Sequence, residues 1–277
     1  MSQMIDFTLP SCQPGRTLHA FRCVPEGEVR AVLQLSHGMV EFIDRYKPLA
    51  ENLAARGILV TGNDHLGHGG SIRTKEDYGY FGEPDGNRAL LEDLHAVTTL
   101  TKQLYPGVPY FLLGHSMGGR AVSVYLKDSI KAAALWAPAD NTGLDGLEFL
   151  DHSAEGRQAI YDGAIQNGVL DLPKWGVTIS ADFVQQVADQ DPTASLRTYN
   201  GPLLLAYTAG DAELLSQTTI DLTRQAAAEH SGPLVDLTGQ YEDATHNFTA
   251  ASGKKIDDFS VRRRIESATA EFFEEYL

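Results

Sequence analysis

The chain has 277 residues, of which 43% are hydrophobic and 21% charged, a composition typical of globular proteins. Its 22 Lys and Arg against 37 Asp and Glu give a net charge of −15, which argues against binding along a nucleic-acid backbone. It has neither a signal-peptide pattern nor an apolar run near the roughly 20 residues of a membrane-spanning helix, and its two cysteines suit reduced thiols in the cytoplasm.

Short apolar segments typical of strands alternate with longer helical segments along most of the chain. Alternating apolar and polar residues at 4–9 and 16–24 predict an antiparallel hairpin. Beyond it, the pattern predicts strands at 31–35, 58–61, 110–113, 132–137, 203–207 and 234–237. It predicts helices at 44–56, at 87–104, from the turn after Ser116 to about Lys127, at 214–230 and from about Phe259. Strands separated by helices predict an α/β fold, with a mostly parallel sheet of about eight strands flanked by helices.

The alternation breaks over residues 139–200, where short segments are rich in Asp and Gly. We interpret this stretch as a small cap inserted over one end of the sheet, so that residues 1–138 and 201–277 form the core domain. The large apolar residues of the cap either line a pocket or form a small core of their own: Phe149, Ile165, Trp175 and Phe183. The sequence does not indicate an oligomeric state.

The most informative motif is Gly114-His115-Ser116-Met117-Gly118, which has the pattern G-x-S-x-G between a predicted strand and a predicted helix. A sharp strand-to-helix turn needs residues without bulk on both sides of the serine. Such a turn lifts the Ser116 hydroxyl out of the sheet, near the positive end of the helix dipole. We therefore expect Ser116 to be a nucleophile, and the alternative is a tight turn with an incidental serine.

A serine nucleophile needs a base, and after this turn the chain order is serine, acid, histidine. Three histidines follow Ser116. His152 lies in the predicted cap, and His230 ends a polar helix. His246 lies in the loop between the last strand and the last helix, where a general base reaches back over the serine, so we expect His246 to be the base.

The acid that orients the base is expected at the end of the strand after the cap. Asp211 ends the segment 203–211 and takes this position. Its expected role is to hold the imidazole tautomer and to stabilise the imidazolium without taking the proton. The alternatives are Asp243, three residues before the histidine, and then Asp221 and Asp236.

Acyl transfer also needs two backbone N–H donors for the oxyanion of the tetrahedral intermediate. One donor is expected from Met117, directly after the nucleophile. The other is expected from Met39, in the loop after an early strand, where Gly38 gives a close turn. Together with Ser116 and His246, these donors complete a site for acyl transfer.

These segments resemble the α/β-hydrolase fold, and in particular the serine hydrolase branch of monoacylglycerol lipases, bacterial lysophospholipase-like esterases and cinnamoyl (feruloyl) esterases. The resemblance is strong over residues 25–140 and 200–250 and weak in the cap. It implies Met39 and Met117 as the oxyanion hole and Asp211 as the acid of the triad. The segments that carry it are His37-Gly38-Met39-Val40-Glu41, Arg45-Tyr46, Leu49-Ala50, Asp64-His65-Leu66-Gly67-His68-Gly69-Gly70-Ser71, Gly114-His115-Ser116-Met117-Gly118-Gly119, Gly210-Asp211 and His246.

Two other patterns suggest a metal site and a dinucleotide-binding loop, but both are weaker than the G-x-S-x-G motif. Asp64-His65-x-x-His68 suggests a metal site, but its glycines favour a tight turn. Gly67-x-Gly69-Gly70 lacks the register of a dinucleotide-binding loop. We therefore predict no metal and no cofactor.

The leading hypothesis is a hydrolase of carboxylic esters that works through an acyl-serine intermediate on a small-molecule ester. A monoacylglycerol, a lysophospholipid and a short-acyl or aryl ester all remain open as substrates. The same triad also suits a thioesterase, an amidase or peptidase, and an acyltransferase, because the cap decides the substrate. A hypothesis from another class is a non-catalytic binding protein with the same fold.

Overall fold

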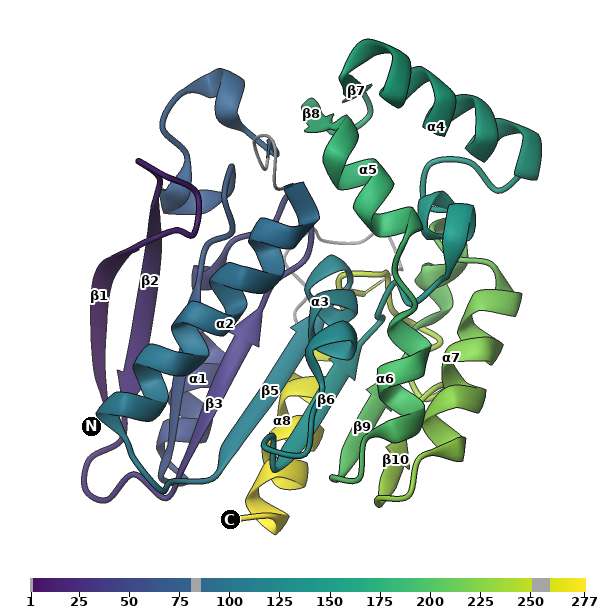
Figure 1. Cartoon of the computed structure of the whole chain (residues 1–277). Coiled ribbons are helices and arrows are strands. Elements are labelled where there is room, and N and C mark those ends of the chain that lie inside the picture. Colours follow the sequence, from purple (N-terminus) through teal and green to yellow (C-terminus); the bar gives the residue numbers. More distant parts are fainter. Residues whose placement is uncertain (1, 81–85, 251–259) are drawn as a thin grey trace.

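A central sheet organises the chain (Figure 1), of which a computed structural model describes residues 2–80, 86–250 and 260–277. Eight strands lie in the order β1-β2-β4-β3-β5-β6-β9-β10, which confirms the predicted α/β fold with a sheet of about eight strands. The strands are β1 (Gln3–Pro10), β2 (Thr17–Val24), β3 (Ala31–Ser36), β4 (Ile58–Asn63), β5 (Tyr110–His115), β6 (Ala132–Trp136), β9 (Leu203–Ala206) and β10 (Leu234–Asp236).

The sheet is mostly parallel. The predicted hairpin is formed by β1 and β2, and β2 also pairs antiparallel with β4. From β4 to β10 every neighbouring pair is parallel. The central strands β3 to β6 are buried along their whole length, which explains their continuous apolar sequences, because a parallel sheet is covered on both faces.

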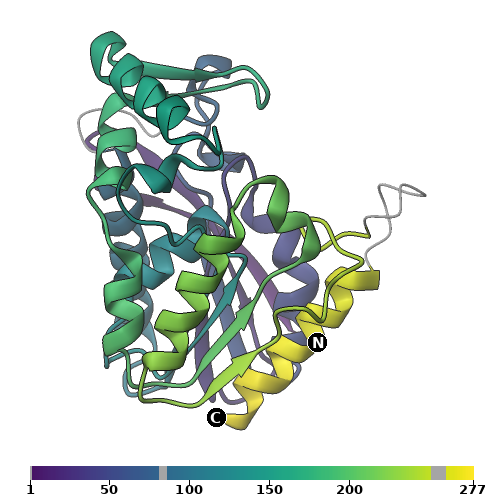
Figure 2. The same cartoon turned by 90° about the vertical axis from the view of Figure 1, so that its right-hand side faces the viewer.

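Helices cover both faces of the sheet (Figures 1 and 2). On one face, α1 (Lys47–Ala54) contacts α8 (Ser260–Glu275). On the other face, successive contacts join α2 (Gly86–Leu104), α3 (Met117–Tyr125), α6 (Pro192–Thr198) and α7 (Gln217–Glu229). Each of the last three strand-to-strand crossovers carries its helix on this second face, as right-handed connections require.

One predicted helix start differs from the structure. The helix predicted over 44–56 begins as a separate 3-10 turn, Ile43–Tyr46, and the α-helix starts only at Lys47, beside Pro48. Proline has no N–H to donate and a fixed φ, so it suits the first turn of a new helix. Phe259, the predicted start of the last helix, lies outside the described residues.

The segment between β6 and β9 stands above the carboxyl ends of the strands, at the top of Figure 1. It contains the 3-10 helix η4 (Gly143–Leu147), α4 (Ala154–Asn167), the antiparallel pair β7 (Val169–Leu172) and β8 (Val177–Ser180), and α5 (Ala181–Ala188). The helix α6 follows and packs against α3 and α7, beside the sheet. The division into a core and a cap at 139 and 200 stays a prediction.

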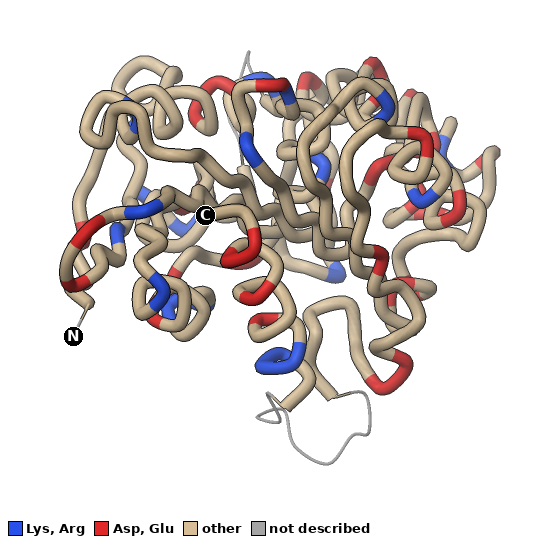
Figure 3. Tube along the Cα trace, turned by 90° about the horizontal axis from the view of Figure 1, so that it is seen from below, with Lys and Arg blue, Asp and Glu red and all other residues tan. Residues whose placement is uncertain are grey.

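Two further observations concern the length of the helices and the distribution of the charged residues. No helix in the described part of the chain is both long enough and apolar enough to cross a membrane. Acidic and basic residues are scattered around the trace when the molecule is seen from below (Figure 3).

Candidate active site

The turn between β5 and α3 holds Ser116 in a strained backbone conformation, with φ +53° and ψ −118°. Non-glycine residues rarely adopt a positive φ, and such strain persists only where the surroundings impose it. A Cβ on Gly114 would lie 2.4 Å from the carbonyl oxygen of Gly118, and a Cβ on Gly118 would lie 2.2 Å from the carbonyl oxygen of Ser36. The glycines of the G-x-S-x-G pattern are therefore required by close backbone approach.

Replacing Gly118 with Ala is expected to destabilise the protein by at least ~3 kcal/mol, because the new methyl group meets backbone that cannot rotate away. Urea denaturation measures the change in the free energy of unfolding. Gly163→Ala is the matched control, since Gly163 lies inside α4 with no atom within 4 Å of an added Cβ. For Gly163→Ala we expect the free energy of unfolding to rise by about 0.5–1 kcal/mol. Equal effects of the two substitutions would contradict the argument.

Ser116, His246 and Asp211 form one hydrogen-bonded chain. The Ser116 Oγ lies 2.8 Å from His246 Nε2, and His246 Nδ1 lies 2.5 Å from Asp211 Oδ1. Asp211 is fully buried, and its second oxygen accepts a hydrogen bond from the backbone N–H of Thr208. This arrangement suits a neutral imidazole that carries its proton on Nδ1 and accepts the hydroxyl proton at Nε2.

The other histidines that follow Ser116 in the chain have different surroundings. The ring of His230 stacks on Tyr199, with centroids 6.4 Å apart, and its Nδ1 contacts the carbonyl oxygen of Ala227. His152 precedes α4, and its carbonyl oxygen accepts a hydrogen bond from Arg157. Only His246 of these three bonds to the Ser116 hydroxyl.

The alternative acids also have partners elsewhere. On the surface, Asp243 pairs with Arg264 at 3.0 Å, and Asp236 pairs with Arg224 at 2.7 Å. Asp221 lies on α7 and accepts a hydrogen bond from the Gln217 side chain. The structure thus brings Asp211, and none of these three, to the His246 ring.

The two expected oxyanion donors lie beside the serine. Met117 is the first residue of α3, where backbone N–H groups have no acceptor within the helix. Met39 lies in the loop after β3 and lines the same pocket as Met117, Ser116 and His246. The loop is closed by a hydrogen bond from Glu41 N to the Gly38 carbonyl oxygen at 3.2 Å.

Glu41 is a central residue of the site for which the sequence indicated no role. Its buried carboxylate accepts hydrogen bonds from Gly38 N at 2.9 Å, Tyr46 Oη at 2.9 Å and Arg45 Nη1 at 2.5 Å. It also accepts from His115 Nδ1 at 2.8 Å. Burial alone would raise the pKa of the Glu41 carboxyl, but His115 and Arg45 outweigh it and hold this pKa well below its usual value.

His115 extends this network to the proposed base. Its Nε2 lies 3.0 Å from the carbonyl oxygen of His246, while its Nδ1 faces the Glu41 carboxylate. Both partners of the ring accept hydrogen bonds, so the geometry is fully satisfied when both ring nitrogens carry protons. The only sequence signal for this network is that Glu41 follows the Gly38 turn and that His115 precedes Ser116.

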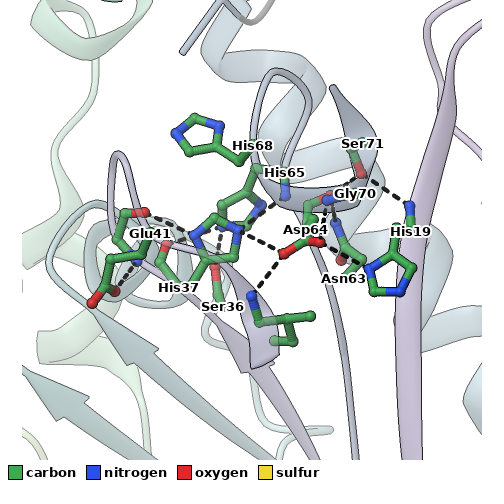
Figure 4. A network of polar contacts seen from close by, with 12 residues as sticks. His19, Ser36, His37, Glu41, Asn63, Asp64, His65, His68, Gly70 and Ser71 are labelled. Carbon is green, nitrogen blue, oxygen red and sulfur yellow. Dashed lines mark hydrogen bonds and ion pairs between the residues drawn. The ribbon is translucent and has the colours of Figure 1, made fainter. Parts of the chain in front are cut away.

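The histidines of the loop after β4 hold the backbone around the site (Figure 4). The Asp64 carboxylate accepts hydrogen bonds from the backbone N–H groups of Ile43 and Gly70, at 2.7 and 2.8 Å. The N–H of His65 donates to His37 Nε2 at 3.0 Å. Burial lowers the pKa values of His65 and His68 in this loop, that of His68 to about 3, and also the pKa of His37 in the loop after β3.

These contacts account for the pattern Asp64-His65-x-x-His68 without a metal. Its carboxylate accepts hydrogen bonds from backbone N–H groups. The His65 ring contacts the carbonyl oxygen of His37 in the neighbouring loop, and the His68 ring contacts that of Leu66 in its own loop. Within the described ranges, no group of three His, Cys, Asp or Glu side chains is arranged to hold a metal ion.

A pocket opens beside Ser116, between the carboxyl ends of the strands and the segment with α5. Two of the large apolar residues of this segment, Phe149 and Trp175, stack with ring centroids 5.6 Å apart and line the pocket. Phe183 lines it as well, whereas Ile165 lies exposed on α4. The pocket is mostly apolar, and its polar lining residues are Asn87, Ser116, Arg120, His246 and Asn247.

Below the pocket, Asp140 is a buried carboxyl that the proposed chemistry does not use. One oxygen accepts a hydrogen bond from Ser123 Oγ at 2.6 Å, and the other has no partner among the described residues. Burial raises the pKa of Asp140 to about 7 from 3.8. The folded chain therefore keeps this proton to a higher pH than the unfolded chain, and the free energy of unfolding falls as the pH rises from about 4 to about 7.

Replacing Asp140 with Asn is expected to remove this fall in the free energy of unfolding with rising pH, because the amide keeps an oxygen for Ser123 and has no charge to bury. The free energy of unfolding of the Asn variant minus that of the wild type should therefore be about 2–3 kcal/mol larger at pH 8 than at pH 5. Urea denaturation at both pH values measures the difference. Asp221→Asn, at an exposed site on α7, controls for the loss of one carboxylate, and a difference that does not grow with pH would contradict the argument.

Comparison with known proteins agrees with this architecture. Residues 27–157 match the family model of the serine aminopeptidases S33, a range that includes Ser116. The monoglyceride lipase homolog of Monkeypox virus is 44% identical over 92 residues, which cover 32% of this chain and 30% of that protein. The human monoglyceride lipase is 38% identical over 103 residues, which cover 34% of this chain and 29% of that protein.

The matched part of the chain thus spans about a third of the length of these curated relatives. Among solved structures, a thermostable carboxyl esterase from Bacillus coagulans superposes with a TM-score of 0.74 at 16% identity, over 99% of this chain and 98% of that one. This likeness extends the agreement in fold to the whole chain. By its fold the chain is an α/β-hydrolase, and its matched part is similar to serine aminopeptidases S33 and to monoglyceride lipases.

Proposed function

We propose that this protein is a serine hydrolase that cleaves carboxylic esters through an acyl-serine intermediate. The observation that carries the proposal is the hydrogen-bonded chain of Ser116, His246 and Asp211 at the wall of an apolar pocket. The similarity to proteins named monoglyceride lipase and carboxyl esterase supports an ester as the substrate. A small-molecule ester is therefore the proposed partner.

In the acylation half-reaction, Ser116 Oγ attacks the carbonyl carbon of the ester while His246 Nε2 takes the hydroxyl proton. Asp211 keeps the other ring proton on Nδ1 and stabilises the imidazolium. The N–H groups of Met39 and Met117 donate hydrogen bonds to the oxyanion of the tetrahedral intermediate. When the intermediate collapses, the carbon–oxygen bond to the alcohol breaks, and His246 gives its proton to the departing oxygen.

In the deacylation half-reaction, water takes the place of the alcohol. His246 removes a proton from this water, which attacks the carbonyl carbon of the acyl-serine. A second oxyanion forms on the same donors, and its collapse frees the acid and returns the proton to Ser116 Oγ. No step needs a metal or an organic cofactor.

The pocket supports an ester with an apolar acyl or aryl group. Phe149, Trp175 and Phe183 come from the proposed cap over residues 139–200, so the cap contributes much of the apolar wall. A monoacylglycerol and a short-acyl or aryl ester both satisfy this description, and the length of the acyl chain is the property that separates them.

The test is hydrolysis of a series of 4-nitrophenyl esters from acetate to palmitate, together with a monoacylglycerol. It is combined with labelling of the wild-type protein by a fluorophosphonate and location of the label by mass spectrometry. We expect hydrolysis of at least part of the series and a label on Ser116. Preference for a thioester or amide would change the substrate class but keep the mechanism. No hydrolysis and no label would overturn the proposal in favour of a non-catalytic binding protein.

A further inference from the structure

Arg120 is a buried cation in the pocket wall. It lies one helical turn after Ser116 on α3, is 4% exposed, and lines the pocket. Its guanidinium donates to three backbone carbonyl oxygens, those of Ala139 at 2.9 Å, Asn141 at 2.6 Å and Val187 at 2.7 Å. Its Nε has no hydrogen-bond partner within the described ranges.

No described carboxylate lies within ion-pair distance of this charge, although Asp140 and Asp191 stabilise it from further away. Among the ion pairs of the described residues, none includes Arg120. The nearby carboxyl of Asp140 bonds instead to Ser123. A buried cation with only neutral partners is costly, and an anion that reaches it gains a strong, charge-assisted hydrogen bond.

Asn87 supplies a second free donor at the same pocket. It is the second residue of α2, is 3% exposed, and its Nδ2 has no partner in the part of the chain that the structure describes. Neutral amide donors that are buried without an acceptor are rare, and an unoccupied ligand site is one explanation for them. In this pocket, the Asn87 amide and the Arg120 guanidinium each have a buried nitrogen without a partner among the described residues.

The helix α5 brings the two residues to one region. A Cβ on Gly86, next to Asn87, would lie 2.6 Å from the backbone nitrogen of Phe183, and Arg120 bonds to the carbonyl of Val187. These two α5 residues both line the pocket. They are four positions apart, which is about 6 Å along a helix. Arg120 and Gly86, the neighbour of Asn87, therefore lie against neighbouring turns of α5, and both Arg120 and Asn87 line the pocket.

We propose that Arg120 and Asn87 form a polar subsite that binds an anionic oxygen group, a carboxylate or a phosphate, carried by the substrate away from its scissile ester. This inference rests on the proposed function and narrows its substrate class to esters with such a group. The planar guanidinium suits both anions, because each presents several oxygens to its N–H groups. Both free nitrogens are covered by the pocket wall, so the side chains around them must adjust when the anion enters.

The test compares matched pairs of substrates that differ by one anionic group. One pair is 4-nitrophenyl hexanoate and the 4-nitrophenyl monoester of adipic acid. The other pair is 1-lauroylglycerol and its 3-phosphate. In at least one pair, the wild-type kcat/KM for the anionic member is expected to exceed that of the neutral member by about tenfold or more. The pair that shows the preference identifies carboxylate or phosphate as the group.

The variants test whether Arg120 and Asn87 cause the preference. Arg120→Gln should lower the ratio of anionic to neutral kcat/KM by about tenfold, and Asn87→Leu by a smaller factor of roughly three. Arg120→Lys keeps the charge and carries the test if the Gln variant does not fold. Arg197→Gln is the matched control and should leave the ratio unchanged, because Arg197 lies on α6 and pairs with Glu229 of α7.

A binding measurement separates this inference from the proposed hydrolysis. In Ser116→Ala, calorimetry compares monoethyl adipate with ethyl hexanoate, and 1-lauroylglycerol 3-phosphate with 1-lauroylglycerol. Tighter binding of an anionic member, lost in Arg120→Gln or Asn87→Leu, supports the subsite even if the wild type hydrolyses no ester. Equal binding and equal kcat/KM within both pairs, or a preference that both variants retain, would show that Arg120 only ties α3 to α5.

Discussion

Replacing Ser116 with Ala is expected to lower kcat/KM for a 4-nitrophenyl ester by about 10⁴–10⁶-fold. The substitution removes the proposed nucleophilic oxygen, while the proposed oxyanion donors, the N–H groups of Met39 and Met117, remain. Because the methyl side chain fits the same backbone, the fold should persist, and circular dichroism checks this. Steady-state hydrolysis by the purified variant measures the loss, after a trace of wild-type enzyme is excluded by active-site labelling.

The companion substitution is His246→Ala, which should cost about as much as Ser116→Ala. The double variant should be little worse than either one, since the serine and its base act as a unit and their effects are not additive. His230→Ala is the matched control, because His230 stacks on Tyr199 away from the serine. A Ser116→Ala variant that keeps more than about a hundredth of the wild-type rate would refute the acyl-serine mechanism.

Replacing Asp211 with Asn is expected to lower kcat by about 10⁴-fold. An amide at this buried position can donate a hydrogen bond to His246 Nδ1, which moves the ring proton to Nε2 and leaves no acceptor for the Ser116 hydroxyl. The shapes of Asp and Asn are nearly identical, so the protein should fold. Measurement of kcat and KM separately should place most of the loss in kcat, because the pocket itself is unchanged.

Asp243→Asn is the control that decides between the two acids closest to the base. Asp243 lies on the surface and pairs with Arg264, so its replacement should change kcat by less than about twofold. If Asp243→Asn is the damaging substitution and Asp211→Asn is not, the acid has been wrongly assigned. The hydrogen bond of 2.5 Å from His246 to Asp211 argues for Asp211 as the acid, and so for a small effect of Asp243→Asn.

Local sequence patterns predicted most of the sheet and the close-packed geometry of the turn at Ser116. Strands buried on both faces are continuous apolar runs, and the glycines around Ser116 follow from contacts as close as 2.2 Å. His246 and Asp211 were predicted from their positions in the topology. Chain order restricts which loops meet at the carboxyl ends of parallel strands, which is why residues 35 positions apart could be paired.

Contacts that depend on three-dimensional packing could not be predicted in the same way. Glu41 and His115 are 74 positions apart, and no local pattern indicates that one carboxylate serves Gly38, Tyr46 and His115 together. The cap region was equally difficult, because its short elements have weak periodicity. Its helix α5 is held partly by the bond from Arg120 to Val187, which no local pattern of the sequence reveals.

The Glu41 carboxylate has a consequence for motion at the site. It bonds to the backbone of Gly38, beside the proposed oxyanion donor Met39, and to His115, which in turn contacts the backbone of His246. An opening of either loop therefore removes a bond on which the other loop depends. The two loops are expected to fluctuate as a single cooperative unit, with the oxyanion donor and the base either both in place or both displaced.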